Sequence, residues 1–580
     1  MGKQKTKSIK ENKTNEIGFS IDKVIPEKFQ TPFLLILLFI LIIIFFSPVL
    51  FGDKTTTSGD LIQVKSLREF SLKERDGVSL WNPHIFCGMP AVVTSMSMRW
   101  YDFSVMIYSY TSRIYTAFFT EYNALYTFNF IILAFTSFFF MRSFGARRGI
   151  SFLVAAGAIF STGILVLFYI GHVSKLISLT YLPFILMMLF KFQKEIKLLD
   201  VLLLIFAMHL LIFSAHVQIV FYFALSALIY FIYFFSRSFI SKDIFLQKQL
   251  LKSLGIAAGA GIIALLMSLD TYSEIYEYKP YSTRGTKSIT ENTANTINQE
   301  SYEYNTNWSF SPGELLTFIV PSYYGFGKSK HQGPLTNNQQ VEVNTYFGQM
   351  PFVDTAMYMG VIIFALGLFA LFVRWKEPAI RFFGITVLFF ILISFGKNFP
   401  LIFDLMYYYF PFFDNFRTPS MILHVVQLFF PILAGFGIMS IVSLRENKND
   451  RLEKVLKNIT IVFAVLFLLS LLLSGSISSW FTSRVNSYTA SLGNSQEAQM
   501  FNALAEYMSG MFTGDLQIAM ALLVLTFGLS YAYAASKINK ELLITAFAIL
   551  ILFDLFRIGN RGASYVESER IKQMFNEPEY

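Results

Sequence analysis

The stretch TPFLLILLFILIIIFFSPVLFGDKTTTSGDLIQVKSLREF, residues 31–70, decides the fold of this chain. Its apolar part, residues 32–51, has the length that a helix needs to cross about 30 Å of hydrocarbon. No small-residue cleavage site follows it, so we expect a retained anchor and not a signal peptide. The polar part begins at once with Gly52 and Asp53. The stretch therefore predicts a membrane helix followed by a polar loop at the membrane surface.

The composition extends this prediction to the whole chain. The 580 residues are 54% hydrophobic and only 15% charged, and they include 66 Phe. A polytopic all-α membrane protein is the class that fits these values. The formal net charge of +9 is concentrated in short loops between apolar runs, which is typical of membrane orientation and not of nucleic-acid binding. The single cysteine, Cys87, excludes an intrachain disulfide, and the sequence contains no nucleotide-binding motif of the GxGxxG or GxxxxGK[ST] type.

Apolar runs recur along the chain, and they predict about thirteen membrane spans. Basic residues fall in every second connection, which places those connections and the N-terminus in the cytoplasm and the C-terminus outside it. The runs are 32–51, 122–141, 150–170, 176–191, 198–215, 217–235, 253–270, 352–373, 381–395, 421–444, 457–474, 516–535 and 541–558. The basic connections are 142–148, 191–197, 237–252, 374–381, 445–457 and 537–540.

These spans divide the chain into five expected regions. They are a disordered cytoplasmic tail (1–31), a first transmembrane module (32–270) with its first outer loop (52–103), a long extracytoplasmic loop (271–351), a set of C-terminal membrane helices (352–558) and an extracytoplasmic tail (559–580).

Ionisable residues inside the predicted spans are few. A charge at the membrane centre costs several kcal/mol, so pumps and transporters reveal themselves by such groups. Here the charged residues lie at span ends, and the lone intramembrane histidines, His209 and His424, are more typical of structural hydrogen bonding than of proton relay. The pattern disfavours transport. The span-end residues are Lys175, Asp270, Asp354 and Asp554.

The first outer loop contains a candidate reactive carboxylate. In residues 61–74, apolar side chains recur at near-helical spacing, with charged side chains on the opposite face. This pattern predicts a short helix in the interface plane. Asp60 then lies at or near the helix N-terminus, either as a functional group or simply as a capping residue. The Gly/Pro-rich turn after it contains Trp81 and Asn82. Such turns position functional groups, but they also merely close loops.

Several cationic and imidazole side chains are expected on the same side. His172 and Lys175 occupy one predicted hairpin, His216 and Gln218 occupy a second, and Arg417 lies in the segment DNFRTPS. Such groups at headgroup depth suit the phosphate of a lipid. Interfacial snorkelling and ordinary turn usage are the alternatives.

The long loop 271–351 is rich in Tyr, Asn, Thr and Ser around Trp308. Aromatic faces beside amides and hydroxyls are typical of a sugar-binding cleft. They are equally typical of a solvated loop next to an aromatic membrane belt.

The chain resembles a known family over residues 32–561. Through its motifs it resembles the YfhO-type bacterial multi-pass membrane proteins, which are similar in turn to the GT-C superfamily of glycosyltransferases. The motifs are WNPHIFCGMP (81–90), GHVSK (171–175), AHVQ (215–218), NWSFSPGELLTFIVPSYYG (307–325), YFGQMPF (346–352), YMG (358–360) and FRTPS (416–420). The resemblance implies a GT-C-like helix bundle in the bacterial cytoplasmic (inner) membrane. It also implies sugar transfer from a polyprenyl-phosphate donor to a cell-envelope glycan, glycolipid or protein on the extracytoplasmic side.

The same resemblance implies roles for individual residues. Asp60 matches the essential acid of the first loop, and Asp53, Asp102 and Glu314 remain open as a second acid. A divalent cation, Mg²⁺ or Mn²⁺, is a possible cofactor. Relatives of this type continue into a further domain, whereas this sequence ends at Tyr580. The expected sugar or acceptor contacts are Trp81, Asn82, Trp308, Tyr323 and Tyr324.

Two other functions stay open at this point. One is a non-catalytic membrane protein that binds or translocates lipid-linked saccharides, and the other is an envelope assembly protein whose outer loops contact partners.

Overall fold

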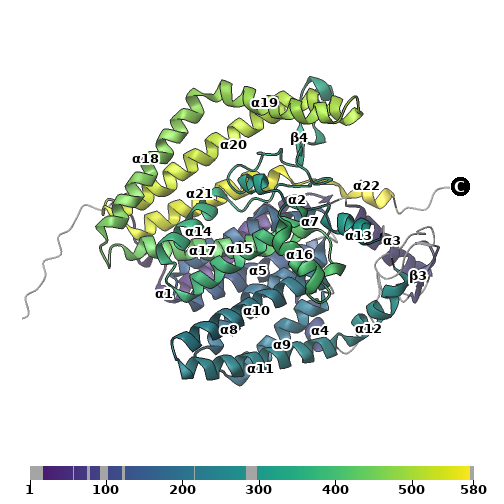
Figure 1. Ribbon diagram of the computed structural model, residues 1–580, viewed down its shortest axis with the longest axis horizontal. Coiled ribbons are helices and arrows are strands. Elements are labelled where there is room, and N and C mark those ends of the chain that lie inside the picture. Colours follow the sequence, from purple (N-terminus) through teal and green to yellow (C-terminus); the bar gives the residue numbers. More distant parts are fainter. Residues whose placement is uncertain are drawn as a thin grey trace, which may run out of the picture.

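The computed structural model describes residues 17–56, 58–74, 79–85, 87–91, 102–119, 124–214, 216–282 and 297–574. Within these residues the structure is a bundle of helices that run side by side (Figure 1). Each predicted apolar run overlaps a helix of this bundle, although residues 352–360 of the run 352–373 are not helical. The bundle helices are α1 (Glu27–Phe45), α5 (Ala124–Ser143), α6 (Arg148–Phe160), α7 (Thr162–Tyr169), α8 (Val173–Phe192), α9 (Leu198–Phe213), α10 (Val217–Ile240), α11 (Ile244–Met267), α14 (Val361–Arg374), α15 (Pro378–Ser394), α17 (Leu423–Ser443), α18 (Asp450–Leu472), α20 (Gln496–Ala534) and α21 (Lys540–Arg561).

Nine of the described helices are long and apolar enough to cross a membrane. The pair α6 and α7 passes the same test together, although it is bent by 44°, and α9, α14 and α15 are shorter apolar helices. The prediction of an all-α polytopic membrane protein is therefore confirmed, while the number of thirteen crossings stays a prediction. Several boundaries differ from the expectation. Helix α1 begins at Glu27 and so includes residues assigned to the tail, α14 begins nine residues after the start of its predicted run, and α20 begins 20 residues before the start of its run.

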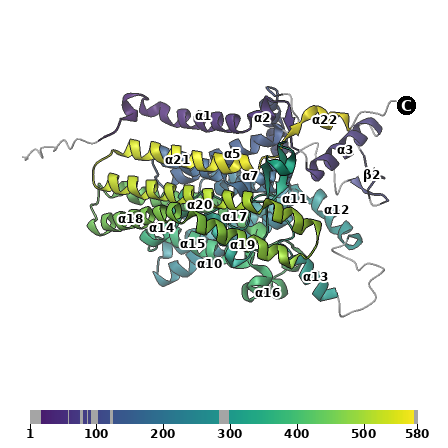
Figure 2. The same ribbon diagram turned by 90° about the horizontal axis from the view of Figure 1, so that it is seen from above.

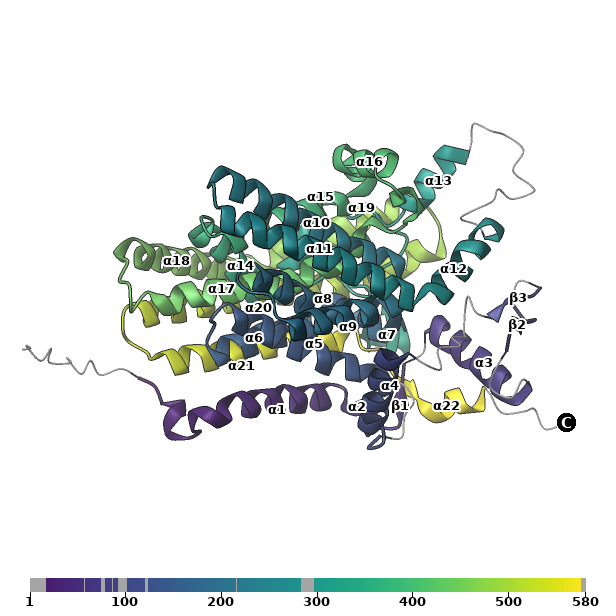
Figure 3. The ribbon, with the colours of Figure 1, turned by 90° about the horizontal axis from the view of Figure 1, so that it is seen from below.

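The two ends of the bundle differ in kind (Figures 2 and 3). One end, which we call the basic end, gathers the N-terminal residues and the short basic connections. Arg148 bonds Glu27 there at 3.1 Å, and the Ile17 amide donates to the Lys537 carbonyl at 3.1 Å. The other end, which we call the loop end, carries the long connections with α3, α12, α13 and α16. This separation is the one that the alternating charge pattern predicts.

The loop end contains the short elements of the long connections. Strand β1 pairs antiparallel with β6, so that Lys54 lies opposite Glu567 and the first loop is tied to the C-terminal segment. The helices are α2 (Ser47–Leu50), α3 (Gly59–Glu74), α4 (Phe103–Thr116), α12 (Leu269–Tyr278), α13 (Ile297–Thr306), η4 (Pro312–Phe318), α16 (Pro400–Tyr409), η8 (Pro419–Ile422), α19 (Ser474–Ser491) and α22 (Ser568–Gln573). The strands are β1 (Lys54–Thr55), β2 (Trp81–Asn82), β3 (Met89–Pro90), β4 (Lys328–His331), β5 (Val341–Asn344) and β6 (Val566–Glu567).

Helix α17 is the centre of the bundle. In the membrane-crossing segment Pro419–Ser443, 94% of the most apolar stretch is buried, against 11% for α18. A helix that is apolar on every side is stable only when other helices surround it, and α6, α14 and α15 pack on α17. Gly437 allows the closest approach, because a Cβ there would collide with the Leu366 carbonyl of α14. Helix α17 is consequently enclosed by its neighbours along most of its length.

The break between α6 and α7 turns the chain towards the loop end. Ser161 adopts an extended conformation with ψ 141°, which interrupts the helix. The freed groups are bonded by a distant segment: the Thr162 amide donates to the Tyr358 carbonyl at 2.9 Å, and the Gly163 amide donates to Gln427 at 2.8 Å. A broken helix is tolerated in a membrane protein when neighbouring segments satisfy its backbone in this way. The bend directs α7 towards the turn that contains His172.

Candidate functional site

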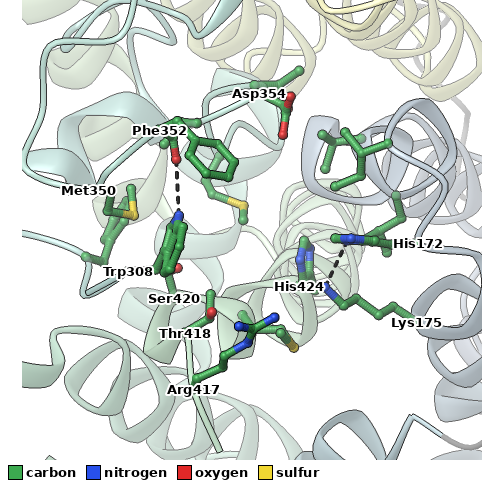
Figure 4. Close-up of a pocket in the computed structure, with 18 of the residues that line it drawn as sticks. His172, Lys175, Trp308, Met350, Phe352, Asp354, Arg417, Thr418, Ser420 and His424 are labelled. Carbon is green, nitrogen blue, oxygen red and sulfur yellow. Dashed lines mark hydrogen bonds between the residues drawn. The ribbon is translucent and has the colours of Figure 1, made fainter. Parts of the chain in front are cut away.

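A cavity of about 710 Å³ opens at the loop end. Four segments that are far apart in the sequence form its walls: the α7–α8 turn, the α9–α10 turn, parts of 308–357 and the stretch 416–424. Figure 4 shows His172, Lys175 and His424 on one side of the cavity, Trp308 across from them, Arg417 at the lower edge, and Phe352 and Asp354 at the upper edge. The cavity is thus built where the N-terminal and C-terminal halves of the bundle meet.

The α7–α8 turn supplies two of these groups. His172 precedes the first turn of α8, and its Nδ1 lies 2.9 Å from the Lys175 Nζ. Gly171 has φ +76°, and a Cβ there would lie 2.5 Å from Leu61 Cγ and from Ser58 Oγ. Only glycine suits this conformation and this close approach. The beginning of α3, in the first loop, therefore packs directly against the turn that carries His172.

The α9–α10 turn supplies the next two. His216 caps α10, where its Nδ1 accepts a hydrogen bond from the Ile219 amide at 3.4 Å. Gln218 is buried, and its Nε2 donates to the Arg417 carbonyl at 2.7 Å and to Tyr222 Oη at 2.7 Å. This side chain fixes the FRTPS segment to α10.

The stretch 416–424 contributes Arg417 and His424. The Arg417 guanidinium donates to Tyr304 Oη and lies over that ring, 5.6 Å from its centroid. His424 lies in the first turn of α17 and faces His172 and Lys175 across a short gap (Figure 4). Helices α8, α10 and α17 all begin at this cavity, so the positive ends of three helix dipoles add to the side-chain charges.

Two carboxylates line the cavity, and both are engaged. Glu314 is only 1% exposed and forms a capping box with Ser311, and Tyr346 Oη donates to its Oε1 at 2.6 Å. Burial raises the pKa of Glu314, against the lowering effect of the hydrogen bonds from Tyr346 and Ser311. Asp354 forms an ion pair with Lys328 at 2.8 Å.

Aromatic side chains form another wall. Trp308 Nε1 donates to the Phe352 carbonyl at 3.3 Å, and the two rings meet edge to face at 5.4 Å. Tyr324 also lines the cavity. Behind it, Arg484 of α19 lies 4.8 Å from the Tyr324 ring and 4.6 Å from the Tyr323 ring. Tyr323 itself faces this arginine and is not among the lining residues.

The structure brings eight of the sequence-predicted site residues together and leaves others outside. The eight lining residues are His172, Lys175, His216, Gln218, Glu314, Trp308, Tyr324 and Arg417. Asp53 lies exposed beside β1 at φ 49°. In the hairpin of β2 and β3, Trp81 is 53% exposed and Asn82 is buried. Phe86 of the same turn lies outside the described residues.

Asp102 belongs to a different buried pair. Its Oδ1 accepts the Val105 amide at 3.0 Å and so caps α4, while its Oδ2 lies 3.0 Å from Nε2 of the buried His209. The contact joins α4 to α9. It gives His209 a neighbouring carboxylate, and the structural role expected of this histidine stays a prediction.

The helix predicted after Asp60 is present as α3. Asp60 is its second residue, and the capping hydrogen bond comes from another side chain, because Ser58 Oγ accepts the Leu61 amide at 3.2 Å. The Asp60 side chain lies outside the described residues. Its proposed catalytic role stays a prediction, but its backbone belongs to the segment that packs on Gly171 beside the cavity.

Sequence reasoning missed several cavity residues. His424 was expected to be structural, and Asp354 was noted only as a charge at a span end. Both line the cavity, together with Thr418 and Phe352. Their closeness in sequence to a motif could have indicated two of them. Thr418 belongs to FRTPS, and His424 follows the last residue of that motif by four residues, which is about one helical turn.

A metal site is not evident in the described part of the chain, where no three His, Cys, Asp or Glu side chains are grouped to hold an ion. The divalent cation stays a prediction without an assigned set of ligands. Comparison of the chain with protein-family models, with curated proteins and with solved structures found no match.

Proposed function

We propose that this cavity binds the phosphate of a polyprenyl-phosphate-linked sugar on the extracytoplasmic side, and that the protein transfers the sugar to a cell-envelope acceptor. The observation that carries the proposal is the convergence of Lys175, Arg417 and three histidines in one cavity with an aromatic wall. These residues come from three separate turns, so their grouping is a property of the fold.

The chemistry of the cavity suits a phosphate ester. Lys175 and Arg417 carry permanent positive charge, and Arg417 presents a planar fork that matches phosphate oxygens. The beginnings of three helices add positive potential. The cavity lies at one end of helices that are long and apolar enough to cross a membrane, and lipid headgroups would lie at that level of a bilayer. A sugar attached to the phosphate would then meet Trp308 and Tyr324.

In the proposed transfer, an acceptor hydroxyl oxygen attacks the anomeric carbon while the bond from that carbon to the phosphate oxygen breaks. The leaving lipid phosphate gains negative charge, and the cations of the cavity stabilise that charge. The hydroxyl proton passes to a general base. Asp60 is the proposed base because α3 begins against the His172 turn, and Glu314 is its competitor because it lines the cavity.

One observation favours a non-catalytic alternative, in which the protein binds or translocates the lipid-linked saccharide. Both described cavity carboxylates already have partners, since Glu314 is bonded to Tyr346 and Ser311 and Asp354 is paired with Lys328. A general base needs an accessible lone pair near the acceptor. Asp60 therefore decides between the two functions.

The test uses the purified full chain in nanodiscs with a panel of polyprenyl-phosphate sugars, and it measures both donor binding and sugar release or transfer. We expect turnover of one donor by the unaltered protein, with loss of turnover but retained binding in Asp60→Asn. Glu303→Gln, an exposed carboxylate of α13, is the control and should behave as the unaltered protein. Binding without turnover in the unaltered protein would favour the carrier, and absence of binding would contradict both functions.

A further inference from the structure

Thr418 has an unusual backbone conformation. Its φ of 62° and ψ of 72° lie in the left-handed region, which a β-branched side chain disfavours strongly. Among the described residues, eight other than glycine have positive φ, and Thr418 is the one of these with a β-branched side chain. Strained residues of this kind persist where the surrounding structure holds them, and they cluster at functional sites.

Hydrogen bonds from three sides impose this conformation. The Thr418 amide donates to the Asn305 carbonyl at 3.1 Å, and the Ser420 amide donates to the Trp308 carbonyl at 3.2 Å. The Met421 amide donates back to the Thr418 carbonyl at 3.0 Å. Residue 419 is a proline without an N–H. The backbone donors from 418 to 421 are therefore used within the protein, and the segment has only side chains to offer a ligand.

The Thr418 side chain faces the cavity. Figure 4 shows it between Arg417 and Ser420, on the wall opposite His172. No hydrogen bond of its hydroxyl is found among the described residues, whereas the neighbouring Arg417 guanidinium donates to Tyr304. Glycine would fit this backbone without strain, so the backbone conformation does not explain why a threonine stands at position 418.

We propose that the Thr418 hydroxyl donates a hydrogen bond to an oxygen of the bound phosphate, next to the Arg417 guanidinium. The strained turn brings the two adjacent side chains to the same anion. This inference rests on phosphate binding in the cavity and names a residue that positions the phosphate group. The shared chemistry is a phosphate oxygen, whether it belongs to a lipid ester or to free phosphate.

The test compares three substitutions in nanodiscs, with farnesyl phosphate in the bilayer as one probe and soluble inorganic phosphate as the other. Thr418→Val removes the hydroxyl at constant shape, Thr418→Gly removes it and relieves the backbone, and Thr418→Ser keeps it. Loss of a hydrogen bond to a charged group predicts about tenfold weaker binding for the Val and Gly variants. The Ser variant should bind within about twofold of the unaltered protein, because it keeps the donor.

Thermal unfolding separates this role from a structural one. Thr418→Gly should unfold at a temperature no lower than the unaltered protein, although it binds more weakly. Phe412→Gly is the matched control, because Phe412 has φ 65°, is 73% exposed and does not line the cavity. It should leave binding unchanged.

The two probes distinguish the source of the phosphate. Affinity for farnesyl phosphate alone would identify a lipid ester as the ligand, and equal affinity for inorganic phosphate would show that the phosphate group is sufficient. The Thr418 substitutions should weaken the binding of either ligand.

Two results would overturn the inference. If the unaltered protein binds farnesyl phosphate and Thr418→Val binds it equally well, the hydroxyl makes no contact, and the proposed function stands without it. If the unaltered protein binds neither probe, both the inference and the proposed phosphate site are wrong.

Discussion

Two clusters of polar and charged residues at the loop end differ in their surroundings, because one is packed inside the protein and the other lines a cavity. In the first, which we call the ion-pair cluster, each charge meets an opposite one. Asp515 is 1% exposed and accepts hydrogen bonds from Arg557 at 2.5 Å, from Arg561 at 2.6 and 2.7 Å, and from Ser322 at 2.6 Å. Asp554 is fully buried and accepts bonds from Tyr358 at 2.7 and 2.9 Å. Two acids and two arginines leave the cluster neutral.

The second cluster lines an open cavity. Lys175 and Arg417 lie there with His172, His216 and His424, and the described acids of the cavity are bonded to Tyr346 and Lys328. A protein interior tolerates buried charge when it is paired, as in the ion-pair cluster. Cationic side chains that line an open volume can instead meet an anion that enters it. The comparison teaches that the arrangement of partners, and not the presence of charged residues, separates a structural cluster from a binding one.

Removing Asp515 should have the largest effect on stability. Asp515→Ala leaves two arginines facing each other in a buried place, and loss of one partner from such a pair costs about 3–5 kcal/mol. We expect poor recovery of folded protein and a strongly lowered unfolding temperature in detergent. Glu446→Gln is the control, because the Arg147–Glu446 pair is exposed by 45% and 67% and should contribute less than about 1 kcal/mol. Equal effects of the two substitutions would show that the ion-pair cluster does not hold the fold together.

Removing Lys175 should affect binding and not stability. Lys175→Met deletes a charge that lines the cavity and keeps most of the aliphatic stem, which preserves the packing of the side chain. Loss of a charge-assisted hydrogen bond predicts at least about tenfold weaker binding of farnesyl phosphate, measured in nanodiscs. Lys330→Met removes the same charge from an exposed site on β4 and should leave binding unchanged. A lowered unfolding temperature with unchanged binding would make Lys175 a structural residue.

Much of the fold could be predicted from the sequence, because hydrophobic length and basic connections are local signals. The membrane helices and the two ends of the bundle follow from them, and the near-helical spacing of residues 61–74 adds helix α3. The break at Ser161 could not be predicted, since residues 150–170 are apolar throughout and the hydrogen bonds that permit the break come from the segment near Tyr358. Hydropathy records whether a residue prefers the membrane, and it contains no information on a distant partner.

The candidate site divides in the same way. His172 and His216 lie in short turns and were correctly expected at one end of the bundle, because a short turn must lie where the two helices that it joins end. The resemblance assigned Asp102 and Trp81 to the same site, but neither lines the cavity, because residues of a long loop are placed by packing. His424 lies in a membrane helix, and only the packing of α17 among its neighbours brings it to the cavity.

Substitution of Glu314 should change the stability least among these predictions. It tests whether a buried acid without an arginine partner behaves differently from the acids of the ion-pair cluster. Glu314 is as buried as the acids of the ion-pair cluster, yet it has no ion pair among the described residues. Burial therefore raises its pKa. A carboxyl group whose pKa is raised in the folded state binds its proton more tightly there. Stability is then highest at low pH, and it falls as the pH rises from the unfolded value of about 4.3 through the raised pKa.

We therefore expect Glu314→Gln to remove this part of the pH dependence. The amide stays neutral, so the unfolding temperature of the variant, relative to the unaltered protein, should rise as the pH increases through that window. Below the window the variant should be slightly less stable, by about 1 kcal/mol, because the capping box is weakened. Glu303→Gln, an exposed acid on α13, should show neither change. If the difference between Glu314→Gln and the unaltered protein is constant with pH, Glu314 is ionised in the folded state as readily as in the unfolded one. It would then belong with the accessible acids, and it would become a stronger rival to Asp60 as the general base.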